Sequence, residues 1–396
     1  MDASKPIIQG FRAGAVAAGI GKKDRLDLGL IFSEREASAA GVFTRNKVKA
    51  APVILSRENL QAGRARAIIA NSGNANACTG EAGLSCARGT AERVARELGV
   101  PPGEVLVAST GVIGAPLNME AIDGAVPELV RSLSPEGLPL VVEAIMTTDS
   151  FPKTARFDGE VGGKPFQIFG MAKGAGMIMP DMATMLCFIL TDIAVEAAPL
   201  RETLSAAVES SFNRITVDGD TSTNDMVLVM ANGVAGNADL SDSDRGEFLR
   251  GLKQVMGDLA WMIVKDGEGA TKVIEVRIRG AASPGDAERA ARVVANSPLV
   301  KTTCYGQDPN WGRIMAALGR SGAAMAEEAV DIWVDDVKIV EGGLGRGADR
   351  EREAAERMKR EVFSLIVDLH QGACEDTVLT CDFTHEYVSI NADYRT

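Results

Sequence analysis

The sequence has little of the side chain that most often serves as a catalytic base. Histidine occurs only twice in 396 residues, at His370 and His385, and neither lies in a recognisable catalytic or metal-binding motif. A zinc motif of the HExxH type is absent, and a serine or cysteine triad would need one of these two imidazoles. We therefore expect both histidines to be structural and any catalytic base to be a different group.

Paired cysteines, basic residues and long apolar runs are also scarce. The six cysteines are widely spaced and form no CxxC pair, so neither a disulfide scaffold nor a metal site such as a zinc site is predicted. Acidic residues outnumber basic ones by 54 to 42, and the net charge of −12 disfavours binding to nucleic acid. No apolar run approaches the roughly 20 residues of a membrane span, and the amino terminus has no signal-peptide pattern. These absences predict a cytoplasmic protein with no nucleic-acid or membrane partner and a small-molecule substrate.

Short apolar runs and helical patterns alternate along the chain, which predicts the α/β class. The runs LDLGLIFS, AAGVFT, APVILS and ARAIIANSG each end at a turn and predict strands. The segment LSCARGTAERVARELGV has apolar residues at helical spacing, and a second helix is predicted over residues 201–212. The order of the strands does not follow from this pattern.

The composition changes near Gly280, where the break SPGD follows the alternating run KVIEVRIRG. We predict a larger domain of residues 1–275 and a smaller α/β domain of residues 276–396. Within the smaller domain, the pattern predicts a helix over residues 349–369 and strands in DTVLTCDFT and HEYVSINADY.

The segment KGAGMIMPDMATML, residues 173–186, leads from glycines through a proline to Thr184. A threonine hydroxyl can attack the carbonyl group that precedes it, and hydrolysis of the resulting ester leaves a threonine with a free α-amine. Such an amine has a pKa of about 7.7 to 8.0 and can accept the hydroxyl proton, so it supplies the missing base. Simpler interpretations stay open here: Thr184 as a strand residue, and the glycines with Lys173 as a tight turn or a phosphate-binding loop.

Three further clusters offer hydroxyl and amide groups. Thr110 and Gly111 follow the apolar run EVLVA, where a hydroxyl and a backbone N–H could stabilise an oxyanion. Thr147 lies in the polar loop MTTDSFPK, where a helix cap or a turn would explain it equally well. The segment NSGNANACTG either lines a site or connects a strand to the next helix. Lys173 could orient a carboxylate.

Taken together, these motifs resemble those of a known family over almost the whole chain. The sequence is similar to the bifunctional ornithine acetyltransferase and glutamate N-acetyltransferase family of arginine biosynthesis. The motifs that carry the resemblance, in the family's order and approximate spacing, are NSGNANACTG, STGVIG, MTTDSFPK, KGAGMIMPDMATML, VDGDTSTND, KDGEGATK, YGQDPNWGR and the terminal NADYRT. So long a chain of motifs is very specific.

The resemblance implies self-cleavage between Ala183 and Thr184, into an α chain of residues 1–183 and a β chain of residues 184–396. It implies that Thr184 is the catalytic nucleophile and that the Thr110 hydroxyl and the Gly111 N–H form an oxyanion hole. The family's two substrates, N-acetylornithine and glutamate, are both zwitterionic amino acids, so Lys173 suits their carboxylate and Glu268 suits their amine. The substrate-binding residues that the resemblance implies are Thr147, Lys173, Thr184, Glu268, Asn391 and Thr396.

The implied reaction transfers acetyl from N2-acetylornithine to glutamate through an acetyl-threonine, giving ornithine and N-acetylglutamate. The acetyl group is carried as an ester on the threonine itself, so no metal and no bound cofactor is implied. Members of the family differ in whether they also accept acetyl-CoA as a donor, and no motif in this sequence separates the two groups. The implied fold is an αββα sandwich shared by both fragments, in which residues 1–275 form the catalytic domain, and the implied assembly is an α2β2 heterotetramer.

Two other functions stay open from the sequence. The same layered architecture occurs in self-cleaving aminopeptidases and amidases, in which water and not glutamate discharges the acyl-enzyme. Thr184 in place of serine, together with Lys173 and Glu268, favours the transferase over the amidase. A non-enzymatic nucleotide-binding or regulatory protein built around the Gly-rich segment would bind nucleotide and would not cut itself.

Overall fold

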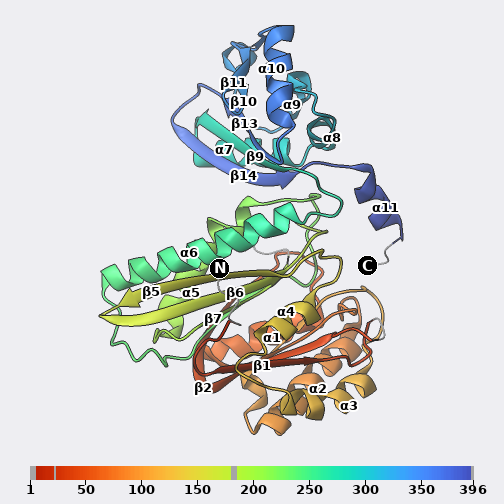
Figure 1. The fold of residues 1–396 in the computed structure, drawn as a ribbon, viewed down its shortest axis with the longest axis vertical. Helices are drawn as coiled ribbons and strands as arrows, with labels where there is room; N and C mark the ends of the chain where they lie inside the picture. The colour runs from red at the N-terminus through yellow and green to blue at the C-terminus, as the bar shows by residue number, and fades with distance from the viewer. Residues whose placement is uncertain (1–5, 22–23, 180–184, 394–396) are drawn as a thin grey trace.

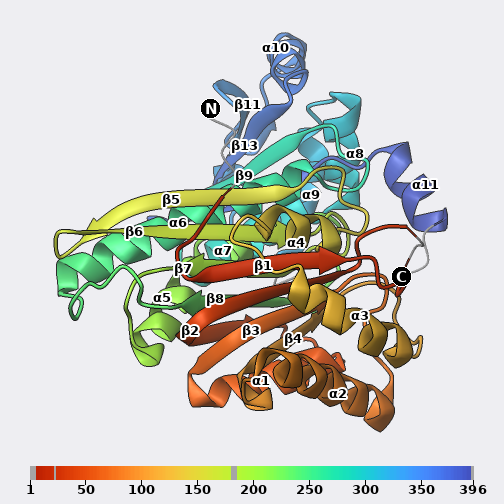
Figure 2. The same cartoon turned by 60° about the horizontal axis from the view of Figure 1, so that its bottom comes forward.

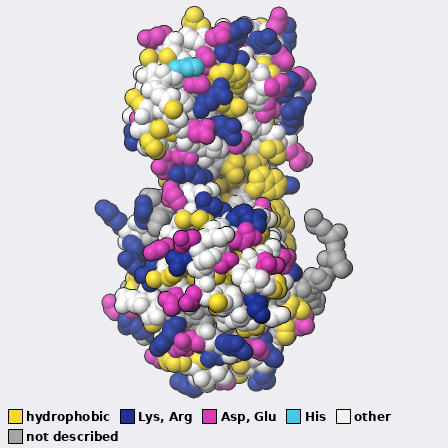
Figure 3. Space-filling view, turned by 90° about the vertical axis from the view of Figure 1, so that its left-hand side faces the viewer, with side chains coloured by type: hydrophobic (Ala, Val, Ile, Leu, Met, Phe, Trp, Pro, Cys, Tyr) yellow, Lys and Arg dark blue, Asp and Glu magenta, His cyan; other side chains and the backbone are white. Residues whose placement is uncertain are grey.

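The computed structural model describes residues 6–21, 24–179 and 185–393. These residues form two β-sheets with helices packed against them, which Figure 1 shows as a larger lower part and a smaller upper part. Figure 3 shows a narrow region between the two parts, where hydrophobic side chains gather. Among the described residues, no helix is both long and apolar enough to cross a membrane.

The first sheet has eight strands in the order β4-β3-β2-β8-β7-β6-β5, with β1 paired to β2. The strands are β1 (Phe11–Val16), β2 (Leu28–Phe43), β3 (Arg64–Asn71), β4 (Val105–Ser109), β5 (Lys153–Val161), β6 (Lys164–Lys173), β7 (Leu186–Thr191) and β8 (Met226–Ala231). The helices along this part of the chain are α1 (Ala51–Asn59), α2 (Gly80–Leu98), α3 (Met119–Arg131), α4 (Leu138–Ile145), α5 (Ala197–Glu209) and α6 (Asp242–Lys265).

The long strand β2 belongs to two halves of this sheet. Residues 28–32 pair with both β1 and β3, whereas residues 38–43 pair with β8. Between these stretches the ladder with β3 is interrupted, and Glu34, Arg35 and Glu36 are exposed. An irregular, solvated stretch of this kind lets a strand bend and change direction.

The two halves of the first sheet face each other across an inner core. In β3, Ile68 points into this core and Ile69 points to the outer face, and Phe188 of β7 enters the same inner core from the other half. On the outer faces, α2 and α3 cover the half containing β3 and β4, and α5 and α6 cover the half containing β5 to β8 (Figures 1 and 2). The layers are therefore helix, sheet, sheet and helix, which confirms the predicted αββα sandwich.

Strands from both sides of position 184 interleave in the first sheet. β7 and β8, which follow this position in the chain, lie between β2 and β6, which precede it. Gly41 of β2 pairs with Leu228 of β8, and Met171 of β6 pairs with Phe188 of β7. A cut before Thr184 would therefore leave the two fragments joined by two ladders of backbone hydrogen bonds.

The second sheet has six strands in the order β12-β11-β10-β13-β9-β14, and only β9 and β13 run parallel among the described pairs. The strands are β9 (Val273–Ala281), β10 (Asp331–Val334), β11 (Val337–Glu341), β12 (Leu344–Gly345), β13 (Val362–Asp368) and β14 (Cys374–Cys381). The helices are α7 (Pro284–Ala295), α8 (Pro298–Gly306), α9 (Trp311–Gly319), α10 (Ala348–Met358) and α11 (His385–Asp393).

The predicted boundary after residue 275 falls inside β9, and the division into two domains stays a prediction. Short 3₁₀ turns complete the described elements at η1 (Leu60–Ala62), η2 (Pro102–Glu104), η3 (Phe212–Arg214) and η4 (Glu327–Ala329).

Three predicted elements are wrong. The run APVILS forms helix α1, because Pro52 in its first turn suits a helix start and has no N–H for a ladder. The helix predicted over residues 349–369 ends at Met358, and β13 follows with Phe363, Leu365 and Val367 alternating into the core of the second sheet. The segment HEYVSINADY forms helix α11 instead of a strand, and none of its described side chains is buried.

A buried ion network holds the loop that follows α4. Lys153, at the start of β5, is fully buried, and its Nζ lies 2.7 Å from Asp149 Oδ1 and 2.5 Å from Asp266 Oδ2. Asp266 follows α6, and it also accepts a hydrogen bond of 3.0 Å from the Ser150 N–H. One ammonium group thus joins the loop, a strand and the end of a helix.

The same network reaches the end of β6. Asp149 accepts hydrogen bonds from the N–H groups of Thr147, at 3.0 Å, and Gly174, at 2.7 Å. Burial by itself would raise the pKa of Asp149, but the charges of Lys173 and Lys153 and the hydrogen bonds from Lys153 and the Thr147 N–H lower it to about 2. Because this pKa lies below the unfolded value, the charged group stabilises the fold above about pH 4, and this contribution is lost as the pH falls toward 2.

We expect Lys153→Met to lower the free energy of unfolding by about 3 to 5 kcal/mol, because it leaves two carboxylates buried without their cation. Urea denaturation followed by circular dichroism measures this change. Lys164→Met replaces an exposed lysine at the start of β6 and is expected to stay within about 0.5 kcal/mol of the wild type. Equal stability of wild type and Lys153→Met would show that the network contributes nothing.

Candidate active site

A cavity lies where one end of the first sheet meets the segment after α6 and the C-terminal helix α11. Its walls combine residues that are far apart in the chain. The lining residues are Ala75, Thr110, Gly111, Ile113, Thr147, Thr148, Lys173, Gly176, Met177, Met185, Leu186, Asp218, Asp220, Ser222, Asn224, Asp225, Glu268, Tyr387 and Asn391. The fold therefore brings together six residues that the sequence placed in the site, namely Thr110, Gly111, Thr147, Lys173, Glu268 and Asn391.

Three predicted site residues cannot be placed in this way. Ala183, Thr184 and Thr396 lie outside the described residues. The next residues along the chain, Met185 and Leu186, line the cavity. The chain immediately after the predicted cut is thus part of the cavity wall.

Thr110 and Gly111 lie where the parallel strands β3 and β4 end side by side. The loops after these strands pair with each other, since Asn74 forms bridges to both Thr110 and Val112. Gly111 has a φ of +129°, and a Cβ there would lie 2.3 Å from the Gly73 carbonyl carbon. Only glycine fits this close approach of two backbones.

Backbone hydrogen bonds engage the N–H groups on both sides of Gly111. The Thr110 N–H donates to the Asn71 carbonyl at 2.9 Å, and the Val112 N–H donates to the Gly73 carbonyl at 3.3 Å. Within the described part of the chain, the intervening N–H of Gly111 has no such acceptor. A backbone donor and the Thr110 hydroxyl therefore stand next to each other in the wall.

Lys173 reaches the same loop from the last position of β6, opposite Leu186 of β7. Its Nζ donates a hydrogen bond of 3.2 Å to Thr110 Oγ1. Burial lowers the pKa of Lys173, and the carboxylates of Asp149, Asp225 and Glu268 oppose this effect.

Glu268 enters the cavity from the turn that follows α6. Its N–H donates to the Ala175 carbonyl at 3.0 Å, which fixes the turn against the Gly-rich segment. A Cβ on Gly176 would come within 2.3 Å of the Glu268 carboxylate, so the space beside that carboxylate exists only because residue 176 is glycine. Asn391 of α11 donates to Glu268 Oε2 at 2.8 Å.

Helix α11 lies to one side of the second sheet (Figure 1), and aromatic contacts hold its first turn. The rings of Phe383 and Tyr387 stack with centroids 4.7 Å apart, and His385 meets Tyr305 of α8 edge-on at 6.0 Å. Thr384 Oγ1 donates to the carbonyl of Gly269, next to Glu268, at 2.7 Å. These contacts place a C-terminal helix against a cavity built mainly by the first sheet.

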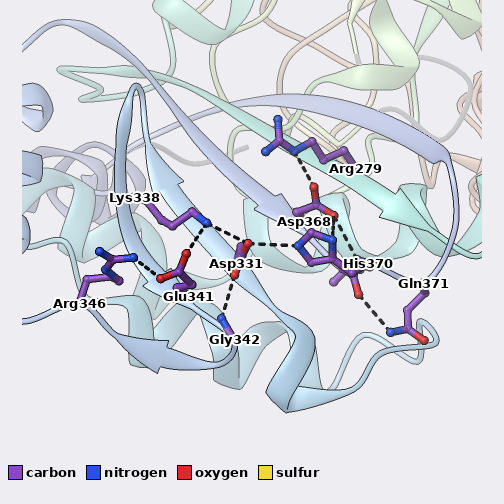
Figure 4. Close-up of polar contacts among 10 residues, drawn as sticks. Arg279, Asp331, Lys338, Glu341, Gly342, Arg346, Asp368, His370 and Gln371 are labelled. Atoms are coloured by element: carbon purple, nitrogen blue, oxygen red, sulfur yellow. Dashed lines mark hydrogen bonds and ion pairs between the residues drawn. The ribbon is translucent and has the colours of Figure 1, made fainter.

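Neither histidine lines the cavity. His370 Nε2 lies 3.1 Å from Asp331 Oδ2, and Lys338 Nζ lies 3.1 Å from the same oxygen. Figure 4 shows this charged cluster on the second sheet, where Asp368 also pairs with Arg279. Since His385 belongs to the aromatic contacts of α11, both imidazoles have structural partners, as the sequence analysis expected.

The sequence analysis missed a set of cavity residues from VDGDTSTND and α11. Burial raises the pKa of Asp225 well above its usual value, and within the described residues its Oδ2 has no hydrogen-bond partner. Burial, together with the charges of Asp218 and Glu268, raises the pKa of Tyr387. The density of acidic and hydroxyl residues in VDGDTSTND was the available signal, but no pattern indicated which of them face a cavity.

Comparison with known proteins identifies the family of this chain. The profile of the ArgJ family matches residues 12–396. The chain is 52% identical over 391 residues to the arginine biosynthesis bifunctional protein ArgJ of Geobacter sulfurreducens, and the match covers 98% of this chain and 100% of that protein. It is 50% identical over 390 residues to the protein of the same name from Desulfotalea psychrophila, and that match covers 98% of this chain and 99% of that protein. The crystal structure of arginine biosynthesis bifunctional protein ArgJ from Bacillus halodurans is 42% identical, with a TM-score of 0.50, covering 52% of this chain and 98% of that chain. The resemblance inferred from the motifs is confirmed, and the chain belongs to the ArgJ family.

Proposed function

We propose that this protein transfers an acetyl group from N2-acetylornithine to glutamate through an acetyl ester on Thr184. The observation that carries the proposal is the cavity itself. It combines a hydroxyl and a backbone N–H at Thr110 and Gly111, an ammonium at Lys173 and a carboxylate at Glu268, and its wall includes Met185, the residue after the nucleophile.

The nucleophile is released by self-cleavage. The Thr184 hydroxyl attacks the carbonyl carbon of Ala183, the peptide C–N bond breaks, and the nitrogen takes the hydroxyl proton. Water then hydrolyses the ester, which leaves a carboxylate on Ala183 and a free α-amine on Thr184. The interleaved strands β7 and β8 support this step, because both fragments stay in one sheet. The Bacillus halodurans chain, matched over 98% of its length but covering 52% of this one, has an extent that fits one fragment of such a cut.

The α-amine of Thr184 then serves as the base for acetyl transfer. It accepts the hydroxyl proton as Thr184 Oγ attacks the acetyl carbonyl of N2-acetylornithine, and it returns that proton to the departing α-nitrogen of ornithine. In the second half-reaction the amine of glutamate attacks the ester, the C–O bond breaks, and the threonine hydroxyl re-forms. The product is N-acetylglutamate.

Thr110 and Gly111 stabilise the oxyanion that forms in both half-reactions. The Lys173 ammonium donates to Thr110 Oγ1, so the hydroxyl proton of Thr110 is free to point toward the acetyl oxygen. The N–H of Gly111 supplies the second donor. The half-buried ammonium next to this pair strengthens both hydrogen bonds, because charges act more strongly in a site of low dielectric.

The charged groups suit zwitterionic substrates. Lys173 binds a substrate carboxylate, and Glu268, oriented by Asn391, binds an amine. Thr147, in the loop held by the ion network, adds a hydroxyl or a backbone carbonyl. Thr396 is the last of the proposed substrate contacts. A phosphate-binding site is not supported, because Asp218, Asp220, Asp225 and Glu268 would surround the ligand with carboxylates.

The proposal needs neither a metal nor a bound cofactor. Acetyl-CoA as an additional donor, the α2β2 assembly and the cytoplasmic location stay predictions. The amidase alternative differs only in the acceptor, and acceptor dependence therefore distinguishes the two functions.

We expect Thr184→Ala to give a single uncut chain without transferase activity, because the methyl side chain can neither attack Ala183 nor carry acetyl. Intact mass and a denaturing gel of freshly purified protein measure the cut. Thr184→Ser keeps the hydroxyl and is expected to cleave before residue 184. Cleavage of Thr184→Ala at that bond would end the self-processing hypothesis.

We expect Thr110→Val to lower kcat for acetyl transfer by roughly 10²- to 10³-fold, because the valine side chain has the shape of threonine but lacks the hydroxyl that donates to the oxyanion. Thr110→Ser retains the hydroxyl and is expected to keep most of the activity. Turnover is followed as ornithine release from N2-acetylornithine, on fully cleaved samples only. Unchanged kcat in the valine variant would remove Thr110 from the oxyanion hole.

Without glutamate, we expect one ornithine to be released per active site and then no further turnover, because acetyl stays on Thr184. Adding glutamate should start continuous release of ornithine with equal formation of N-acetylglutamate. Rapid-quench sampling and intact mass of the acetylated β chain measure both phases. Continuous release without glutamate would instead identify an amidase, in which water discharges the ester.

A further inference from the structure

One short segment of the chain contacts both flanks of the predicted cut. We call residues 216–226, which run from Thr216 into the start of β8, the template segment. It contacts residues 177–179 before the cut and residues 185–186 after it. All of these residues lie in the described part of the chain.

The contacts before the cut centre on Asp218. Its Oδ2 accepts a hydrogen bond of 2.6 Å from the Met177 N–H, and its Oδ1 accepts one of 2.9 Å from the Ile178 N–H. Two consecutive backbone donors are thus held by one carboxylate, and hydrogen bonds to a charged acceptor are the stronger kind. The Val217 N–H also donates to the Ile178 carbonyl at 2.6 Å.

Met177 needs such a partner because its backbone is in an uncommon conformation. Its φ is +57°, in the left-handed region that residues other than glycine rarely adopt. A conformation of this kind persists only where surrounding contacts hold it. Met179 is also held by the template segment, because Thr221 Oγ1 donates a hydrogen bond of 3.1 Å to its carbonyl. The contacts of the segment thus continue toward the cut.

The contacts after the cut come from the same segment. The Met226 N–H donates to the Met185 carbonyl at 3.0 Å, and Leu186 pairs with Met226 in the parallel ladder of β7 and β8. β8 itself lies between β2 and β7 near the middle of the first sheet. The template segment is therefore fixed by the sheet, and through it both ends of the stretch that contains Ala183 and Thr184 are fixed.

We propose that Asp218 is a positioning residue for self-cleavage, because its carboxylate holds Met177 and Ile178 so that the Ala183 carbonyl meets the Thr184 hydroxyl. This inference rests on the proposed function. Asp218 takes no proton in the reaction; the hydroxyl oxygen bonds to the carbonyl carbon, the C–N bond breaks, and water completes the cut. An attack within one chain depends steeply on geometry, and a misplacement of about 1 Å can slow such a step roughly 10²-fold.

An asparagine at position 218 tests the carboxylate with little change of shape. Its amide oxygen can accept from one of the two N–H groups, but its NH₂ group then faces the other donor. Asp220 gives a matched control, since it lies two residues away, lines the same cavity, and is not among the groups that hold Met177 or Ile178. Asp220→Asn therefore makes the same change of charge without releasing the backbone before the cut.

The experiment follows the cut in newly synthesised full-length chains, by pulse labelling and denaturing gels, for the wild type, Asp218→Asn and Asp220→Asn. We expect Asp218→Asn to cleave at least tenfold more slowly and Asp220→Asn to stay within about twofold of the wild type. Asp218→Asn chains that are still uncut should have a thermal midpoint close to that of uncut Thr184→Ala chains, which a general folding defect would not allow. Cleavage of Asp218→Asn at the wild-type rate would overturn the inference.

A second variant keeps the test decisive if Asp218→Asn does not fold. Thr221→Val removes only the hydrogen bond to the Met179 carbonyl and changes no charge, and we expect it to slow cleavage by a smaller factor than Asp218→Asn, with an unchanged thermal midpoint. Wild-type cleavage by Thr221→Val would overturn the template segment's role. A wild-type protein that stays uncut would overturn the proposed function and this inference with it, whereas normal cleavage in all variants would overturn this inference alone.

Discussion

The fold depends on one strand being shared between two half-sheets. β2 pairs with β1 and β3 along its first part and with β8 along its last part, and the exposed polar stretch between them lets it bend. The bend turns the halves toward each other, so the ends of β3, β4 and β6 meet the starts of β7 and β8 at one place. Loops, glycines and charged residues gather there because strand ends leave backbone groups and side chains free for other partners. The cavity is a consequence of that convergence.

The same arrangement would keep the fold stable after the proposed cut. A cut before Thr184 falls between β6 and β7, which are neighbours in the sheet. Both proposed fragments contribute strands to the inner core, and the ladders of β2 with β8 and of β6 with β7 join one fragment to the other through hydrogen bonds that the cut would not break. The proposed cut would therefore leave the sandwich in one piece, and the α-amine that it releases would supply a base to a cavity that no histidine lines among the described residues.

Charge in the site is balanced by two lysines with different tasks. Lys153 is fully buried between Asp149 and Asp266 and holds the loop that carries Thr147. Lys173 faces the cavity and is shared between Thr110 and nearby carboxylates. A site built in this way offers both signs of charge within a small volume, which is what a zwitterionic amino acid requires.

The sequence by itself determined the α/β class and, through its ordered motifs, the family. Its alternating and helical patterns failed at APVILS and HEYVSINADY, because a few apolar residues in a short run do not distinguish a short helix from a strand. Only the tertiary structure decided that Glu268 and Asn391 meet Lys173 and Thr110, and that Asp218 and Asp225 face the same cavity. The physical reason is that these contacts join residues far apart in the chain, 63 positions for Thr110 with Lys173 and 123 for Glu268 with Asn391. Their distances depend on the bend of β2 and the packing of α11, which no local pattern encodes.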